Sequence, residues 1–127
     1  MKRLLLDTEV LIWWDENNPS LGGNARAAIQ NADAVYVSAA SAWEVAIKSA
    51  IGKLRTRRQL ATAVADGGFE ELPISFAHAQ AVGELAPHHK DPFDRLIIAA
   101  ARVEGLTVVT SDEKLKPYDV RLIDARH

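Results

Sequence analysis

Four acidic residues stand at positions in this sequence where a carboxylate can do chemistry. Asp7 ends the first apolar run, Asp112 follows the fourth, and Glu44 and Asp94 lie early in two predicted helices. Carboxylates gathered in one cleft repel one another unless a divalent cation lies among them. Oxygen ligands without cysteine favour a hard ion such as Mg²⁺ or Mn²⁺. Such an ion activates water and stabilises charge on a phosphate, so the predicted chemistry is phosphoryl transfer.

Three of these acids also have a purely structural explanation. Ser41 and Glu44 fit a capping box, in which each side chain satisfies a free backbone N–H of the other. Asp94 lies in a first helical turn, where negative charge suits the helix dipole, and Asp112 could cap a short turn. Asp91, just before a proline, is a natural helix N-cap.

Asp7 is harder to explain structurally, because a carboxylate at a buried strand end costs free energy unless it is paired or metal-bound. In a parallel sheet the first and fourth strands are neighbours if the strand order reverses between them. Asp7 and Asp112 then face each other across a crevice, and Glu44 and Asp94 begin helices at the same edge. We therefore expect the four acids to converge.

The elements that must position these acids alternate along the chain. Strands are predicted at 3–7, 34–38, 69–74, 106–110 and 120–123. Helices are predicted at 8–14, 24–32, 41–51, 75–85 and 92–104, with one more ending at Val64. This alternation predicts an α/β fold with a mainly parallel sheet and helices on both faces. No linker or repeat divides the sequence, so we expect one domain over residues 1–127.

Composition narrows the class of protein. The 127 residues are 48% hydrophobic and 25% charged, with no cysteine and a net charge of −2. This acidity counts against a protein that holds nucleic acid by charge alone, but less against an enzyme whose carboxylates hold cations. There is no signal-peptide pattern and no apolar stretch of about 20 residues, so we expect a cytoplasmic protein without a membrane segment.

Several stretches resemble motifs of one known family. Residues 4–8 and 38–44 resemble the opening motifs of the PIN-domain family, and residues 89–99 are similar to a subgroup of VapC-type toxins. Residues 109–112 and 118–120 continue the resemblance in the expected order. In this subgroup a histidine often follows Asp-Thr, whereas this chain has Glu9, which either tightens metal binding or points outward.

The resemblance implies a three-layer α/β/α sandwich and an RNA endonuclease that uses Mg²⁺, with Mn²⁺ able to substitute. It also implies a toxin that is inhibited by a small cognate antitoxin and that forms a homodimer. The catalytic set carried over by motif is Asp7, Glu44, Asp94 and Asp112, with Asp7 and Asp94 as the metal ligands. We expect the antitoxin to bring an arginine to these acids and to lay an apolar helix near the tryptophans.

Other residues are candidates for contacts with the substrate. Thr110 and Ser111 could hold a phosphate oxygen or could cap the turn, and Arg95 could touch the scissile phosphate or pair with a neighbouring acid. The one basic cluster is Lys48, Lys53, Arg55, Arg57 and Arg58, which is either a solvated face or a strip that follows the RNA backbone. His88 and His89 are expected to face solvent, although a histidine base is conceivable. We expect Trp13, Trp14 and Trp43 at the edges of the cleft.

Two other functions fit part of the pattern. Asp7 could be the nucleophile of a haloacid-dehalogenase-like phosphatase, which needs a second acid two residues later, where Glu9 stands. That scheme gives Glu44 no role. The chain could also be a non-catalytic PIN-like module that binds a partner, although an intact set of four acids argues against this.

Overall fold

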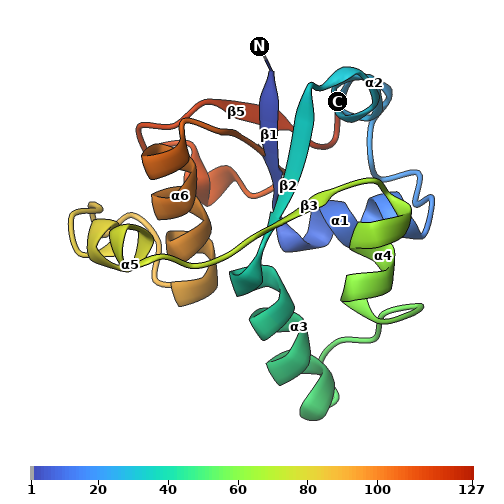
Figure 1. The fold of residues 1–127 in the computed structure, drawn as a ribbon, viewed down its shortest axis with the longest axis horizontal. Coiled ribbons are helices and arrows are strands. Elements are labelled where there is room, and N and C mark those ends of the chain that lie inside the picture. The colour runs from blue at the N-terminus through green and yellow to red at the C-terminus, as the bar shows by residue number, and fades with distance from the viewer. Residues whose placement is uncertain (1) are drawn as a thin grey trace.

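A computed structural model describes residues 2–127 (Figure 1). Its strands are β1 (Arg3–Leu6), β2 (Ala34–Ser38), β3 (Glu70–Leu72), β4 (Thr107–Thr110) and β5 (Leu122–Asp124). Its helices are α1 (Thr8–Asp15), α2 (Gly23–Asn31), α3 (Ala39–Ala50), α4 (Leu60–Asp66), α5 (Phe76–Val82) and α6 (Pro92–Glu104). A short 3₁₀ turn, η1 (Glu113–Leu115), follows β4. Among the described residues, no helix has both the length and the hydrophobicity that crossing a membrane requires.

The five strands form one sheet in the order β3-β2-β1-β4-β5, and every neighbouring pair is parallel. The predicted α/β fold is therefore confirmed. β1 lies at the centre, with Leu5 opposite Tyr36 on one side and Val108 on the other. A central parallel strand is covered on both faces, which explains why β1 is a continuous apolar run rather than an alternating one. The strand order reverses at β1, as the convergence of the acids requires.

Helices cover both faces of the sheet and make the three layers. One core joins the sheet to α1, α2 and α4 around Leu4, Leu6 and Leu11. The other joins it to α5 and α6 around Leu5 and Ile98. α3 continues from the end of β2 beyond the carboxyl edge of the sheet (Figure 1).

Local sequence explains most helix boundaries. Asp91 caps α6, whose first residue is Pro92, and Gly105 ends it with φ 69°, a conformation that favours glycine. The prediction for α3 was wrong at its start, because Ser38 is the N-cap and the helix begins at Ala39 rather than residue 41. The third strand is shorter than predicted, and the fifth runs over 122–124.

Candidate active site

The carboxyl ends of β1 and β4 open onto a cleft of about 540 Å³. Its acidic lining consists of Asp7, Glu9, Glu16, Glu44, Asp91, Asp94 and Asp112. The structure thus brings together all four predicted acids, which come from the end of β1, from α3, from α6 and from the turn after β4. They are separated by up to 105 positions in the sequence, so only the strand order can bring them together.

Asp7 and Glu44 are the buried members of this group, each with 7% of the residue exposed. Asp7 lies at the end of β1. It is the N-cap of α1, and its Oδ1 accepts a hydrogen bond from the Thr8 N–H at 2.8 Å. Its Oδ2 accepts from the Thr110 hydroxyl at 2.7 Å. Burial raises the pKa of Asp7 to about 6 even though both hydrogen bonds lower it, and the charges of Glu44 and Asp112 raise it further. Two neutral donors therefore orient this carboxylate without neutralising it.

Glu44 lies on α3, and its side chain points to α1. Because the helix begins two residues before Ser41, the capping-box explanation for Glu44 is wrong. Its Oε1 accepts instead from the Thr8 hydroxyl at 2.7 Å, which is also 2.8 Å from the Ser41 hydroxyl. Its Oε2 pairs with Lys48 at 2.6 Å, and this contact raises the pKa of Lys48. Glu44 is thus the one acid of the four with a lysine partner.

Asp91 and Asp94, at the start of α6, have different roles. Asp91 Oδ1 accepts from the N–H groups of Phe93 and Asp94, which confirms that Asp91 is the helix cap. Asp94, one turn later, is mostly buried, with 14% of its side chain exposed. Burial raises the pKa of Asp94 to about 7, and the charges of Asp7 and Asp91 add to the effect. Asp94 and Asp7 therefore form an electrostatically unfavourable pair in the protein without metal.

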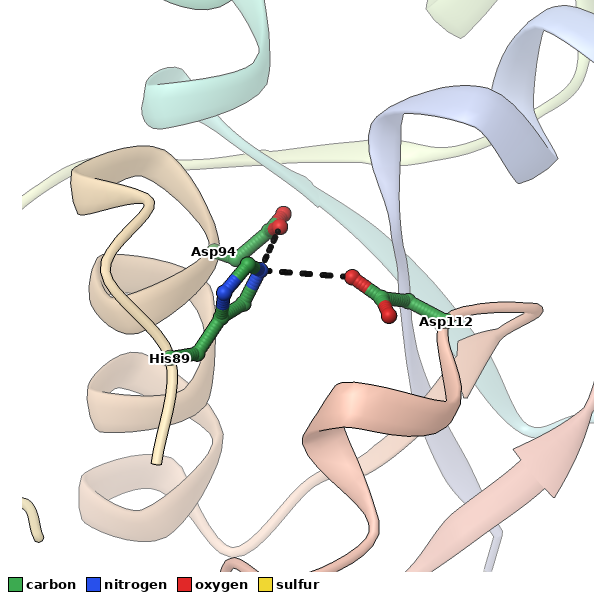
Figure 2. A group of neighbouring side chains, drawn as sticks. All are labelled: His89, Asp94 and Asp112. Carbon is green, nitrogen blue, oxygen red and sulfur yellow. Dashed lines mark hydrogen bonds and ion pairs between the residues drawn. The ribbon is translucent and has the colours of Figure 1, made fainter. Parts of the chain in front are cut away.

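His89 joins Asp94 to Asp112 across the cleft (Figure 2). Its Nε2 lies 2.8 Å from Asp94 Oδ2 and 3.3 Å from Asp112 Oδ2. Its Nδ1 accepts from the Lys90 N–H at 3.1 Å, so Nε2 carries the ring hydrogen and donates to the acids. The expectation that His89 faces solvent was wrong, since only 12% of its side chain is exposed. The sequence signal that could have placed His89 in the site was its position two residues before Asp91, the cap of α6.

Asp112 has two roles in the structure, because its oxygens face different groups. Oδ1 accepts from the Lys114 N–H at 2.9 Å and caps η1, as its structural explanation predicted. Oδ2 faces His89 in the cleft. The capping and site interpretations of Asp112 are therefore compatible. Glu9 is exposed but lines the same cleft.

The three substrate candidates have different environments. The Thr110 hydroxyl is buried and fully engaged, because it donates to Asp7 and accepts from the Asp112 N–H at 3.0 Å. Ser111 lines the cleft. Arg95 does not, and no carboxylate among residues 2–127 pairs with it: its guanidinium donates to backbone carbonyls and to the Tyr118 hydroxyl. Arg95 thus holds the loop before α6 in place, and the predicted ion pair with a neighbouring acid is wrong. Its contact with the scissile phosphate stays a prediction.

The basic cluster is divided between two places. Arg57 and Arg58 pair with Asp15 at the end of α1, and Arg58 also pairs with Asp66. Lys48 and Lys53 line the cleft. Arg55 is exposed, so the cluster is part solvated and part paired. Its contact with the RNA backbone stays a prediction.

The tryptophans are also in different places. Trp13 lines the cleft and is nearly buried, whereas Trp14 packs on Phe69 away from it. Trp43 is half exposed, makes an edge contact with Phe93 and is absent from the cleft lining. Only Trp13 lies where the sequence predicted.

Comparison with known proteins identifies the class to which this fold and site belong. The sequence profile of the PIN domain matches residues 4–120, and the chain is a member of the PIN-domain family. More particularly, it is 36% identical to Ribonuclease VapC22 of Mycobacterium tuberculosis over 93% of each chain.

Solved structures agree with this assignment. The DNA-bound VapBC of Salmonella typhimurium is 26% identical, covers 98% of each chain and superposes with a TM-score of 0.71. VapBC2 of Rickettsia felis, bound to a promoter DNA fragment, has the same TM-score at 19% identity, covers 96% of this chain and 98% of that one, and supports the fold. The comparisons give no support to the phosphatase alternative.

The residues of the cleft fit a divalent metal ion, which PIN nucleases use. Ligand atoms of His89, Asp94 and Asp112 all lie within 4.8 Å of one another. Because His89 Nε2 donates to the acids in the metal-free protein, the two carboxylates are the ligands that this group offers. Asp7 and Asp94 carry raised pKa values because their negative charges are buried close together. A cation among these oxygens relieves that repulsion, and a set dominated by carboxylates favours a hard ion.

Proposed function

We propose that this chain is a Mg²⁺-dependent endoribonuclease and the toxin of a toxin–antitoxin pair, with Mn²⁺ able to replace Mg²⁺. The observation that carries the proposal is the convergence of Asp7, Glu44, Asp94 and Asp112 on one cleft of a PIN-domain fold. Four acids from four elements, two of them buried with raised pKa values, are costly to the fold unless they hold a cation. The 36% identity to a ribonuclease of this family supports RNA as the substrate.

The residues of the cleft have distinct proposed tasks. Asp7 and Asp94 hold the metal, while Glu44 and Asp112 complete the site or orient its waters. When bound, a divalent ion lowers the pKa of a water and neutralises charge on the phosphate and the leaving oxygen. Thr8 fixes both Asp7 and Glu44, through its N–H and its hydroxyl respectively.

Other groups in the cleft position these acids. Thr110 donates to Asp7 and at the same time accepts from the backbone of Asp112, so one hydroxyl couples the ends of β1 and β4. The Nε2–H of His89 holds Asp94 and Asp112 facing the cleft. These contacts fix the carboxylates before substrate arrives, which reduces the ordering that binding must supply. Ser111 is the remaining hydroxyl available to a phosphate oxygen.

The partner proposal rests on the structural neighbours and on an exposed face of α3. Solved neighbours are complexes of toxin and antitoxin, including VapBC-5 of Mycobacterium tuberculosis. Trp43, Ile47 and Ile51 are exposed and spaced by four residues, so they lie on one side of α3 and the turn that follows. We expect the cognate antitoxin to cover apolar surface of this kind and to bring an arginine to the acids.

The oligomeric state and the location in the cell follow from the proposed function and not from contacts in the structure. We propose that the chain forms a homodimer. A toxin that cleaves cellular RNA must meet its substrate, so we place it in the cytoplasm.

The test is direct. Purified, antitoxin-free protein is incubated with total cellular RNA in Mg²⁺, in Mn²⁺ or in chelator, and the cut ends are mapped by sequencing. We expect discrete cuts with either ion and none with chelator. Cleavage that persists in chelator contradicts a metal-dependent mechanism, and intact RNA in every condition contradicts the nuclease.

A further inference from the structure

One positively charged side chain at the edge of the carboxylate cleft has no role in the proposed mechanism. Arg126 lines the cleft, two residues after β5. It thus stands after its strand as Asp112 stands after β4, since the carboxyl ends of parallel strands share one edge. Its guanidinium lies over the Trp13 ring, 5.1 Å from the centroid, within the range of a cation–π contact.

Among the described residues, two other cations near the cleft have carboxylate partners. Lys48 pairs with Glu44, and Arg58 pairs with Asp15 and Asp66. In the same part of the chain, exposed Lys53 lines the cleft without such a partner, but unlike Arg126 it lies over no aromatic ring. Within residues 2–127, no carboxylate lies within 4.0 Å of the Arg126 guanidinium. Its charge is therefore available to a ligand, although the cleft beside it is lined with acids.

The backbone around Arg126 is fixed rather than loose. The Ala125 N–H donates to the Thr110 carbonyl at 2.9 Å, and the Ala125 carbonyl accepts from the Gly22 N–H at 2.9 Å. The Asn24 N–H donates to the His127 carbonyl at 2.7 Å. A Cβ on Gly22 would overlap the backbone of Arg126 and His127, so only glycine allows this close approach. Backbone contacts and an aromatic ring thus hold a charged group at a defined place.

We propose that Arg126, stacked on Trp13, is an anchor for a backbone phosphate of the RNA at the edge of the carboxylate cleft. This inference rests on the proposed nuclease function. A chain with a net charge of −2 gains little from long-range attraction to RNA, so local cations must hold the polyanion beside the acids. A guanidinium suits this task, because its planar fork donates two parallel hydrogen bonds to phosphate while its face stacks on indole.

The test measures how RNA binding depends on salt. A short fluorescein-labelled oligouridylate is titrated by fluorescence anisotropy across a series of NaCl concentrations, with chelator present to prevent cleavage. Arg126→Gln is expected to weaken binding about three- to tenfold at low salt. It is also expected to reduce the slope of log K against log salt by about 0.7, the value for one lost contact to single-stranded nucleic acid. Arg126→Lys should keep the parent slope and lose less affinity, because it keeps the charge.

Arg121→Gln is the matched control, since Arg121 is also exposed but lines a hollow at the opposite edge of the sheet. It should leave both affinity and slope unchanged, and thermal melts should show all three variants folded. In cleavage assays with Mg²⁺, Arg126→Gln should raise KM and leave kcat nearly constant.

Failure of the Arg126 anchor and failure of the proposed nuclease function give different results. A parent protein that cleaves RNA while Arg126→Gln and Arg121→Gln bind equally well overturns the anchor and leaves the nuclease intact. A parent that cleaves without salt-dependent binding also overturns the anchor. A parent that neither binds nor cleaves RNA overturns the proposed function and the anchor with it.

Discussion

Two aspartates at the two ends of α1 have opposite electrostatic environments. Asp7, at the start, is 7% exposed, and Asp15, at the end, has 8% of its side chain exposed. Asp15 contacts Arg57 and Arg58, and they hold its pKa below the ordinary value. Asp7 has only neutral hydrogen-bond donors and other acids around it, and burial raises its pKa to about 6.

This difference separates a structural acid from a candidate functional one. Asp15 receives the cations it needs from the chain itself, so its charge is satisfied when the protein folds. Within residues 2–127, Asp7 and Asp94 have no lysine or arginine partner, and burial raises the pKa of both. The acid cluster therefore stores unfavourable electrostatic energy that a bound cation relieves.

Neutralising the functional acids should have the largest effect. Asp7→Asn and Asp94→Asn are each expected to reduce RNA cleavage by roughly a hundredfold or more, because an amide keeps the shape but not the charge that holds the metal. Asp15→Asn and Asp91→Asn are the controls. Cleavage rates for the four variants, with Mg²⁺ in excess, check this. Equal losses in Asp94→Asn and Asp91→Asn would contradict the division of tasks on α6.

Mg²⁺ should stabilise the folded protein by binding to the acids of the cleft. A hundredfold excess of Mg²⁺ over its dissociation constant is expected to add roughly 2.7 kcal/mol, about 10 °C in Tm for a chain of this size. Asp94→Asn should raise Tm in chelator and lose the response to Mg²⁺. Differential scanning calorimetry checks both, with NaCl at equal ionic strength as the control. A wild-type Tm that Mg²⁺ leaves unchanged would argue that the acids are only caps.

The raised pKa values predict how stability depends on pH without metal. A carboxyl whose pKa is higher in the folded state binds its proton more tightly there, so its contribution is full at low pH and is lost as pH rises through the folded value. For Asp7 at about 6 and Asp94 at about 7, both above the ordinary value of 3.8, stability should fall between about pH 4 and pH 7. One pKa unit corresponds to about 1.4 kcal/mol, so the raised values of the two acids together predict a loss of several kcal/mol.

Urea unfolding in chelator at several pH values measures this dependence. Asp94→Asn should flatten the curve, whereas Asp15→Asn should leave it unchanged in this range. The lowered pKa of Asp15 has the opposite sign, so its contribution is lost only as pH falls through that lowered pKa, at more acidic pH. A stability that rises from pH 4 to pH 7 would contradict the buried repulsion.

Removing the charge of Asp15 should give the smallest effect, of about 1 kcal/mol. Asp15→Asn loses the ion pairs with Arg57 and Arg58 that join α1 to the loop before α4, so the expected change is a modest destabilisation. Its RNA cleavage should equal that of wild type once the protein is folded. Denaturant melts and cleavage rates on the same preparation check the two effects together.

Local patterns predicted most of the fold. A buried parallel strand, a proline at the start of a helix and a glycine after its end each act through nearby residues, so β1 and α6 could be read from sequence. The start of α3 could not, because Ser38 and Ser41 are both good caps and only packing of Thr8 against Ser41 and Glu44 decides between them.

The candidate site was predictable in its acids but not in the groups that hold them. Acids after strands and early in helices could be found by position. His89 and Arg95 lie in or beside the same polar loop, and their tasks depend on distant partners: His89 reaches Asp112, and Arg95 reaches Tyr118. Arg126 acquires its position from Gly22 and Trp13, more than 100 residues away. Such roles come from tertiary contacts, which no local pattern encodes.

The Thr110–Asp7 hydrogen bond has a consequence for the moment at which the protein becomes active during translation. Asp7 is among the first residues that a ribosome makes, but the strand beside it and the hydroxyl that orients it are made about a hundred residues later. A nascent chain that ends before β4 lacks Asp112 as well as Thr110. We therefore expect unfinished copies of this chain not to cleave the RNA around the ribosome that makes them.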